Sequence, residues 1–123
     1  MTEVKNEATV NAVLGNTYLI LHSRDEEKFE EQRKKARELM EKALELDPAN
    51  IWAHLGLKDV KLYNNDYEGA IAQLLEGMKQ NPDNSRLSFE LGECYLLAHA
   101  EHALANEDCL NKASENYSKL LQL

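Results

Sequence analysis

The sequence predicts an all-α protein built from repeated antiparallel helix pairs. Two segments rich in turn-forming residues, 46–50 (Leu-Asp-Pro-Ala-Asn) and 80–84 (Gln-Asn-Pro-Asp-Asn), place Pro48 and Pro82 34 residues apart. Proline ends a helix because it has no N–H to donate, and the Asn or Asp that follows can cap the next helix. A third turn signal, Asn-Asn-Asp at 64–66, divides the stretch between them into two apolar patterns of helical spacing. Neither helix alone could bury its apolar stripe, so the pattern favours stacked pairs.

Six helices follow from these signals. We expect them at about residues 3–22, 24–46, 51–64, 66–80, 85–104 and 106–122. Ser23 precedes Glu26 by three residues, which is a capping-box start for the second helix, and Asn106 takes the corresponding place before the sixth. The helices form units at about 3–50, 51–84 and 85–123, and the 123 residues suffice for a single domain.

Charge and hydropathy exclude several classes of partner. The chain has 14 basic and 22 acidic residues, a formal net charge of -8, which repels phosphate backbones and anionic membrane surfaces. We therefore expect no nucleic-acid partner. No stretch reaches the roughly 20 apolar residues of a membrane span, and the N-terminal ten residues lack the basic and apolar regions of a signal peptide. The two cysteines give no disulfide framework. We expect a cytoplasmic protein without a membrane partner.

The three units resemble the tetratricopeptide repeat, whose small, aromatic and closing proline positions recur here. The matching residues are Leu14, Gly15, Tyr18, Ala36, Met40, Ala43 and Pro48; Leu57, Ala70, Leu74, Gly77 and Pro82; and Leu91, Gly92, Tyr95, Ala113 and Tyr117. In the second unit Lys58 stands where Gly is usual and Lys61 where Tyr is usual. The resemblance implies a right-handed α-solenoid of three antiparallel helix pairs.

The first and third units are longer than the second. Gly15 and Ala36 are 21 residues apart, as are Gly92 and Ala113, whereas the second-unit interval is 12. We expect the nine extra residues to lengthen both helices of each outer pair by about one turn, so that the outer hairpins overhang the middle one.

The resemblance also implies that the first helix of each unit lines a concave binding groove. The best candidates for this groove are Asn16, Leu19, Trp52, Leu55, Asp59, Tyr63, Arg86, Phe89, Glu93 and Leu96; a wider set adds Thr9, Ala12, Ile20 and Leu97. Aromatic and aliphatic groups with a few interleaved charges are typical of binding hot spots. We expect a protein or peptide partner that is apolar or amphipathic rather than acidic. The alternative is that Trp52 and Phe89 pack between adjacent units.

The carboxylate clamp found in some members of that family is not expected here. It requires Lys, Asn and Arg at fixed groove positions, and only Asn16 and Arg86 match. Ala12, Gly56 and Glu90 replace the other clamp residues, and the chain is acidic overall.

Catalysis, a cofactor and a metal are likewise not expected. The sequence has no Gly-rich phosphate loop and no HExxH motif. His99 and His102 share a helix face, but Cys94 lies five residues before His99 and is out of phase with that pair, and no second spaced pair exists.

The sequence leaves alternatives open on two points, how the chain assembles and which narrower family it resembles. Leu120, Leu121 and Leu123 end the last helix, and no seventh helix follows to cover them, which suggests a homodimer formed through the C-terminal helix, a self-assembling structural unit, or a fragment of a longer repeat array. The elongated first hairpin is similar to the apoprotein-binding tetratricopeptide domains of bacterial cytochrome c maturation proteins.

Overall fold

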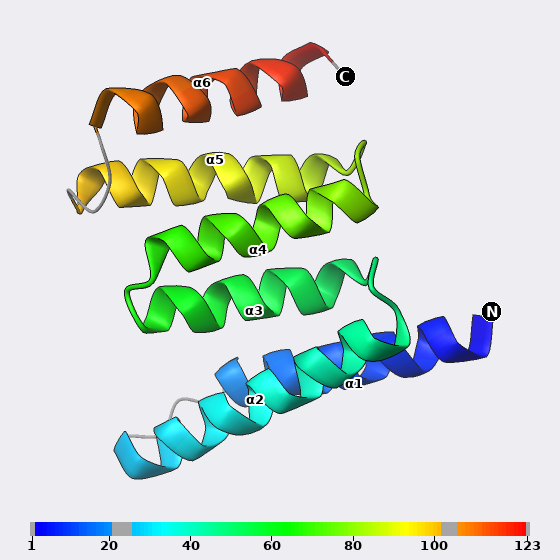
Figure 1. Cartoon of the computed structure of the whole chain (residues 1–123). Coiled ribbons are helices and arrows are strands. Elements are labelled where there is room, and N and C mark those ends of the chain that lie inside the picture. The colour runs from blue at the N-terminus through cyan, green and yellow to red at the C-terminus, as the bar shows by residue number, and fades with distance from the viewer. Residues whose placement is uncertain (1, 21–25, 102–105, 123) are drawn as a thin grey trace.

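The described part of the chain is α-helical, as predicted. The computed structural model describes residues 2–20, 26–101 and 106–122, and no strand occurs in these ranges. The helices are α1 (Thr2–Ile20), α2 (Glu26–Leu46), α3 (Ile51–Tyr63), α4 (Tyr67–Gln80), α5 (Ser85–Ala100) and α6 (Asn106–Gln122). They pack as the pairs α1–α2, α3–α4 and α5–α6, and the pairs stack in chain order (Figure 1). This arrangement is an α-solenoid of three helical hairpins.

The turn residues cap the helices as the sequence predicts. The side chains of Asn50 and Asn84 accept hydrogen bonds from backbone N–H groups in the first turns of α3 and α5, each at 3.0 Å. Asp66 caps α4 in the same way, at 2.9 Å. Asn65 lies at a φ of 57°, a left-handed conformation that asparagine tolerates and that lets the chain reverse between α3 and α4. Ser23 and the side chain of Asn106 lie outside the described residues.

The extra residues of the outer hairpins are distributed unequally. In the third hairpin, α5 extends eight residues beyond Gly92 and α6 begins seven before Ala113, against five and three for the matching positions of α3 and α4. Each helix of that hairpin thus gains about one turn, as predicted, and Figure 1 shows the end of α5 and the start of α6 extending past the α3–α4 turn.

For the first hairpin the expectation is wrong for α2, and the predicted extension of the first helix to residue 22 lies outside the described residues. There α2 begins ten residues before Ala36 and gains about two turns, whereas α1 is described to Ile20, which corresponds to the last residue of α3. The described extension of this hairpin lies in α2, and its first turns contact the end of α3 through Phe29 and Tyr63.

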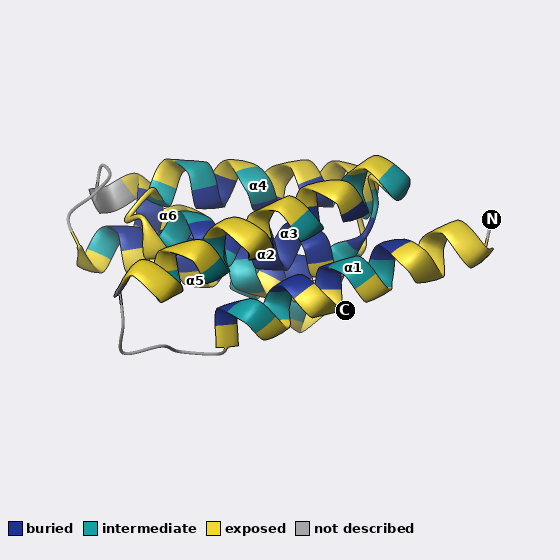
Figure 2. Ribbon diagram, turned by 90° about the horizontal axis from the view of Figure 1, so that it is seen from below, coloured by how far each residue is buried: buried dark blue, intermediate teal, exposed yellow. Residues whose placement is uncertain are grey.

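Two apolar clusters hold the hairpins together. The first cluster joins α1, α2 and α3 around the fully buried Met40. The second cluster contains residues of α3, α4, α5 and α6 and surrounds the fully buried Leu74 and Leu87. Buried residues lie where the helices face one another, and exposed residues cover the outside (Figure 2). Gly15 and Gly56 approach Met40 from α1 and α3. The absence of a side chain at these glycines allows α1, α2 and α3 to pack closely.

A buried histidine links the second hairpin to the turn before it. His54 is buried, and its Nε2 lies 2.8 Å from the carbonyl oxygen of Pro48. Its Nδ1 lies 2.9 Å from the side-chain nitrogen of Gln73. Since a carbonyl can only accept, Nε2 carries the proton and Nδ1 accepts from the Gln73 amide. Both ring nitrogens are therefore hydrogen-bonded, one to the turn before α3 and the other to α4.

Candidate partner-binding groove

A groove of about 550 Å³ runs across the first helices of the three hairpins. Its lining residues are Val13, Asn16, Leu19 and Ile20 of α1; Trp52, Leu55, Asp59 and Tyr63 of α3; and Arg86 of α5. The four residues of α3 follow one another at intervals of three and four, so they form one stripe along that helix. Helical spacing places the lining residues on one face of each helix. The stacking of the hairpins then sets these faces of α1, α3 and α5 beside one another, which forms the groove.

Seven of the ten principal candidate residues line this groove: Asn16, Leu19, Trp52, Leu55, Asp59, Tyr63 and Arg86. The structure does not bring the other three, Phe89, Glu93 and Leu96, into it. The ring of Phe89 packs instead on Tyr117 of α6, with centroids 6.0 Å apart. Burial and the neighbouring Glu93 carboxylate raise the pKa of Tyr117, which places Glu93 beside the same ring. Phe89 and Glu93 thus lie beside Tyr117 within the third hairpin, and Phe89 remains 44% exposed.

The wider candidate set is also divided. Ile20 lines the groove, whereas Thr9, Ala12 and Leu97 do not. Ala12 is fully buried in the first apolar cluster. The hydroxyl of Thr9 accepts a hydrogen bond of 3.0 Å from the side chain of Asn50. Val13 was not among the candidates, although its position three residues before Asn16 on the same helix could have indicated it.

Large apolar groups remain open to solvent in the groove. Trp52 is 49% exposed, Tyr63 40% and Ile20 76%, whereas Leu19 and Leu55 are buried. Clustered exposed aromatic and aliphatic groups are costly to keep in water and mark interaction surfaces. Half of the Trp52 side chain is thus available for contact, which disfavours the alternative that it only packs between units.

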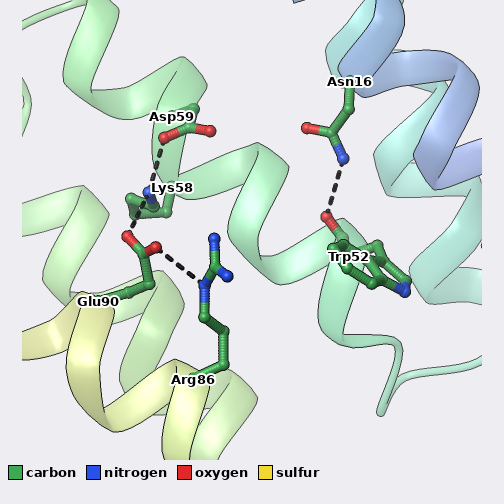
Figure 3. Close-up of polar contacts among 6 residues, drawn as sticks. All are labelled: Asn16, Trp52, Lys58, Asp59, Arg86 and Glu90. Atoms are coloured by element: carbon green, nitrogen blue, oxygen red, sulfur yellow. Dashed lines mark hydrogen bonds and ion pairs between the residues drawn. The ribbon is translucent and has the colours of Figure 1, made fainter.

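Two contacts set the position of the aromatic groups. The side-chain nitrogen of Asn16 lies 3.4 Å from the backbone carbonyl oxygen of Trp52 and links α1 to α3 (Figure 3). At the other end of the stripe, Tyr63 packs edge-on against Phe29 of α2, with centroids 5.6 Å apart. The guanidinium carbon of Arg33 lies 4.8 Å from the centroid of the Phe29 ring. The two added turns of α2 therefore support the Tyr63 ring.

A network of four charged residues joins α3 to α5 beside the groove. The Lys58 ammonium lies 2.7 Å from Asp59 Oδ1 and 3.0 Å from Glu90 Oε2. The other oxygen of Glu90 accepts a hydrogen bond of 3.1 Å from Arg86 Nε (Figure 3). Lys58 was not among the predicted groove residues, although its replacement of the usual glycine was a signal in the sequence that could have indicated it.

Burial and pairing act in opposite directions on Lys58. Lys58 is only 6% exposed. Burial alone would lower the pKa of Lys58, but hydrogen bonds and attraction from Asp59 and then Glu90 raise that pKa above the ordinary 10.5. Lys58 is therefore a cation at neutral pH, and both carboxylates are needed to compensate its buried charge.

The described residues offer no evident catalytic or metal centre. Burial raises the pKa of the Cys94 thiol to about 11, so this cysteine is a poor nucleophile at neutral pH. No group of three or more His, Cys, Asp or Glu in the described ranges could hold a metal, and His102 lies outside them. None of the helices within those ranges is sufficiently long and apolar to cross a membrane.

Comparison with known proteins gives one family. No curated protein matches the sequence. The family model of the tetratricopeptide repeat matches residues 30–88, which include most of α2, all of α3 and α4, and the first turn of α5. Its proteins are in general modules for protein-protein interaction. This match and the stacked helical hairpins fit a tetratricopeptide repeat protein.

Proposed function

We propose that the chain is an adaptor that holds an apolar or amphipathic segment of a partner protein in the groove between α1, α3 and α5. The observation that carries this proposal is the half-exposed Trp52 side chain, which lines the groove together with the exposed Ile20 and Tyr63 and the buried Leu19 and Leu55. A partner that covers these rings removes apolar area from water at about 25 cal/mol per Å².

The groove favours binding over catalysis. Its ionisable groups are Asp59, Tyr63 and Arg86, and the first is already paired with Lys58 at 2.7 Å. A nucleophile beside a general base, which covalent catalysis requires, is not found among the described residues that line the groove. A location in the cytoplasm stays a prediction from the sequence.

Trp52 is the single tryptophan of the chain, so its fluorescence reports directly on the groove. We expect a partner recovered from a native lysate and then purified to shift Trp52 emission to the blue and to protect it from acrylamide quenching. The Trp52→Ala variant should lose the partner while its circular dichroism remains that of the parent.

The matched control is Leu75→Ala, which removes an exposed aliphatic side chain from α4, away from the groove. This variant should retain the partner. Equal capture by the parent and Trp52→Ala, or binding that leaves Trp52 fluorescence unchanged, would reject the groove as the binding surface.

A further inference from the structure

We infer that the partner packs a second element, an amphipathic α-helix with an aliphatic stripe and a basic residue at one end, on the outer face of α1. This face consists of the exposed residues Val10, Val13, Leu14 and Thr17, and it lies opposite the buried side of the helix. The inference rests on the proposed function, because it assigns a second contact surface to the protein that occupies the groove.

The outer face of α1 carries apolar side chains in contact with water. Val10 is 65% exposed and Leu14 46%. No charged residue occurs in the sequence from Ala8 to Ile20, whereas α6, at the other end of the solenoid, has acidic and basic residues along its length. Because the end of a solenoid needs a polar outer face to remain soluble, α6 has the composition of a terminal helix and α1 does not.

The matching positions on the other first helices are covered. With Gly15 aligned to Lys58 and Gly92, the residues that match Val10, Leu14 and Thr17 are Ala53, Leu57 and Val60 on α3 and Leu87, Leu91 and Cys94 on α5. All of these matching residues are buried. Met40 of α2 lies in one apolar cluster with the α3 residues, and Leu74 of α4 lies in another with the α5 residues. The outer face of α1 therefore repeats a surface that elsewhere in the chain is covered by a helix.

The polar groups on and beside this face are already hydrogen-bonded. The hydroxyl of Thr17 donates a hydrogen bond of 2.9 Å to the backbone carbonyl oxygen of Val13. The side-chain nitrogen of Asn11 donates one of 2.9 Å to the carbonyl oxygen of Glu7. A covering helix would thus remove aliphatic groups from water without leaving these donors unpaired.

The covering helix is not joined to α1 by the turn that joins the other hairpins. Asn50 and Asn84 cap α3 and α5, and Glu7 has the matching position in the first hairpin. Glu7 lies inside α1, which begins at Thr2, and Figure 1 shows the start of α1 extending past the α2–α3 turn. The reversal of the chain that brings α2 onto α3 and α4 onto α5 has no counterpart in residues 2–7. We therefore expect the cover from another molecule.

The protein that occupies the groove fits this face better than a second copy does. Two α1 faces alone would pair only a few residues on each side, whereas a stable interface has about 20–30 residues on each side. Val13 lines the groove and also belongs to the outer face of α1, so the two surfaces are continuous. A partner seated in the groove therefore reaches the outer face without a break and gains a larger apolar interface.

Charge indicates the orientation of the partner helix. Glu3 and Glu7 are exposed and continue the stripe of Val10 and Leu14 towards the start of α1, at intervals of three and four residues. These carboxylates favour Lys or Arg at the end of the helix that lies beside them. Within the chain, α4 has Lys79 in its last turn, next to the start of α5. A partner helix with the same geometry runs antiparallel to α1 and has its basic residue near its C-terminus.

The test uses a peptide with the sequence of residues 67–80, because α4 covers the matching face of α5. A hydrocarbon staple in place of the exposed Ala72 and Glu76 side chains keeps this short segment helical. Fluorescence anisotropy of the labelled peptide measures its binding to the full chain. We expect the parent and Trp52→Ala to bind the peptide equally, since this contact does not need the groove.

Charge substitutions on the two terminal helices give the decisive comparison. Leu14→Glu and Val10→Glu should each weaken peptide binding by about tenfold or more. Leu110→Glu is the matched control, because Leu110 is exposed to a similar degree, 44% against 46% for Leu14, but lies on α6. This control should bind the peptide as the parent does. Circular dichroism establishes that each variant is folded.

The partner recovered through the groove extends the test to the natural ligand. Leu14→Glu should bind this partner more weakly than the parent does, because one of the two contact surfaces is damaged. At saturation the partner should still shift the emission of Trp52, because the groove is intact in this variant.

The outcomes separate the two proposals. If the parent does not bind the peptide, or if Leu14→Glu binds it as well as Leu110→Glu does, the helix site is overturned and the groove proposal stands. Peptide binding that is lost in Trp52→Ala and kept in Leu14→Glu would also overturn the site. A dimer of the parent that dissociates in Leu14→Glu would make a second copy the occupant and reject the partner helix. Partner binding that depends on Leu14 and not on Trp52 would reject the groove proposal alone.

Discussion

The Lys58 ammonium group lies 3.0 Å from the Glu90 carboxylate, and this contact links α3 of the second hairpin to α5 of the third. The matching positions of the outer hairpins hold Gly15 and Gly92, which are close to Met40 and Tyr117 of their own second helices. The middle hairpin thus has a buried cation where the outer ones have close helix packing. Four predictions follow from this and related contacts.

Glu90→Gln should lower the free energy of unfolding by about 1–3 kcal/mol, because it removes one of the two carboxylates that compensate a buried ammonium. Chemical denaturation measures the change. Glu76→Gln is the control, since it removes a glutamate from an exposed ion pair with Lys79 and should cost about 0–1 kcal/mol. Equal costs for the two variants would show that the contact between Lys58 and Glu90 does not stabilise the fold.

The protein should lose stability at alkaline pH. The folded-state pKa of Cys94 is raised from 9.0 to about 11 by burial, and those of Lys58 and Tyr117 are raised above 10.5 and 10.0. Each group loses its proton at lower pH in the unfolded chain than in the folded one. The contribution of these groups to the free energy of unfolding is therefore complete below pH 9, and it is lost as the pH rises through their folded-state pKa values.

Denaturation midpoints measured between pH 8 and 11 test this prediction. Cys94→Ala should flatten the part of the decline that begins near pH 9. A midpoint that stays constant up to pH 11, or rises, would contradict the burial of these groups.

Gly56→Ala should destabilise the fold by about 1–3 kcal/mol despite the better helix propensity of alanine. A Cβ at this position would overlap the end of the buried Met40 side chain and lie 2.9 Å from the Asn16 side-chain oxygen. The converse change on an exposed part of α4, Ala72→Gly, should cost about 1 kcal/mol from propensity alone. If Gly56→Ala is instead stabilising, Met40 can repack freely and the close approach of α1, α2 and α3 is not required.

Analytical ultracentrifugation should give a monomer near 14.0 kDa. The exposed leucines of α6, Leu110 and Leu121, are separated by exposed polar residues that include Lys112, Glu115 and Lys119. A mostly polar outer face on α6 needs no second copy to cover it. Twice that mass, returning to the monomer in Leu121→Glu, would instead support the predicted homodimer through the C-terminal helix.

The groove illustrates how much local patterns predict. The stripe of Trp52, Leu55, Asp59 and Tyr63 was predictable because residues three or four apart share one face of a helix. Phe89 satisfied the same rule on α5 but packs on Tyr117 of α6, within its own hairpin. Val13 was missed although the same rule, applied from Asn16 on α1, could have indicated it. The pattern identifies a face of a helix, whereas its neighbours depend on hairpin length and stacking.

The sequence by itself determined the local structure of this protein: helix ends at the prolines, Asn and Asp caps at the turns, and an apolar stripe along each helix. These features depend on backbone chemistry and on residues a few positions apart. Only the tertiary structure decided that Lys58 pairs with Glu90, that the described extension of the first hairpin lies in α2, and that Arg86 faces the groove. Such contacts join residues distant in sequence, and their energies depend on burial and distance, which are set only when the hairpins stack.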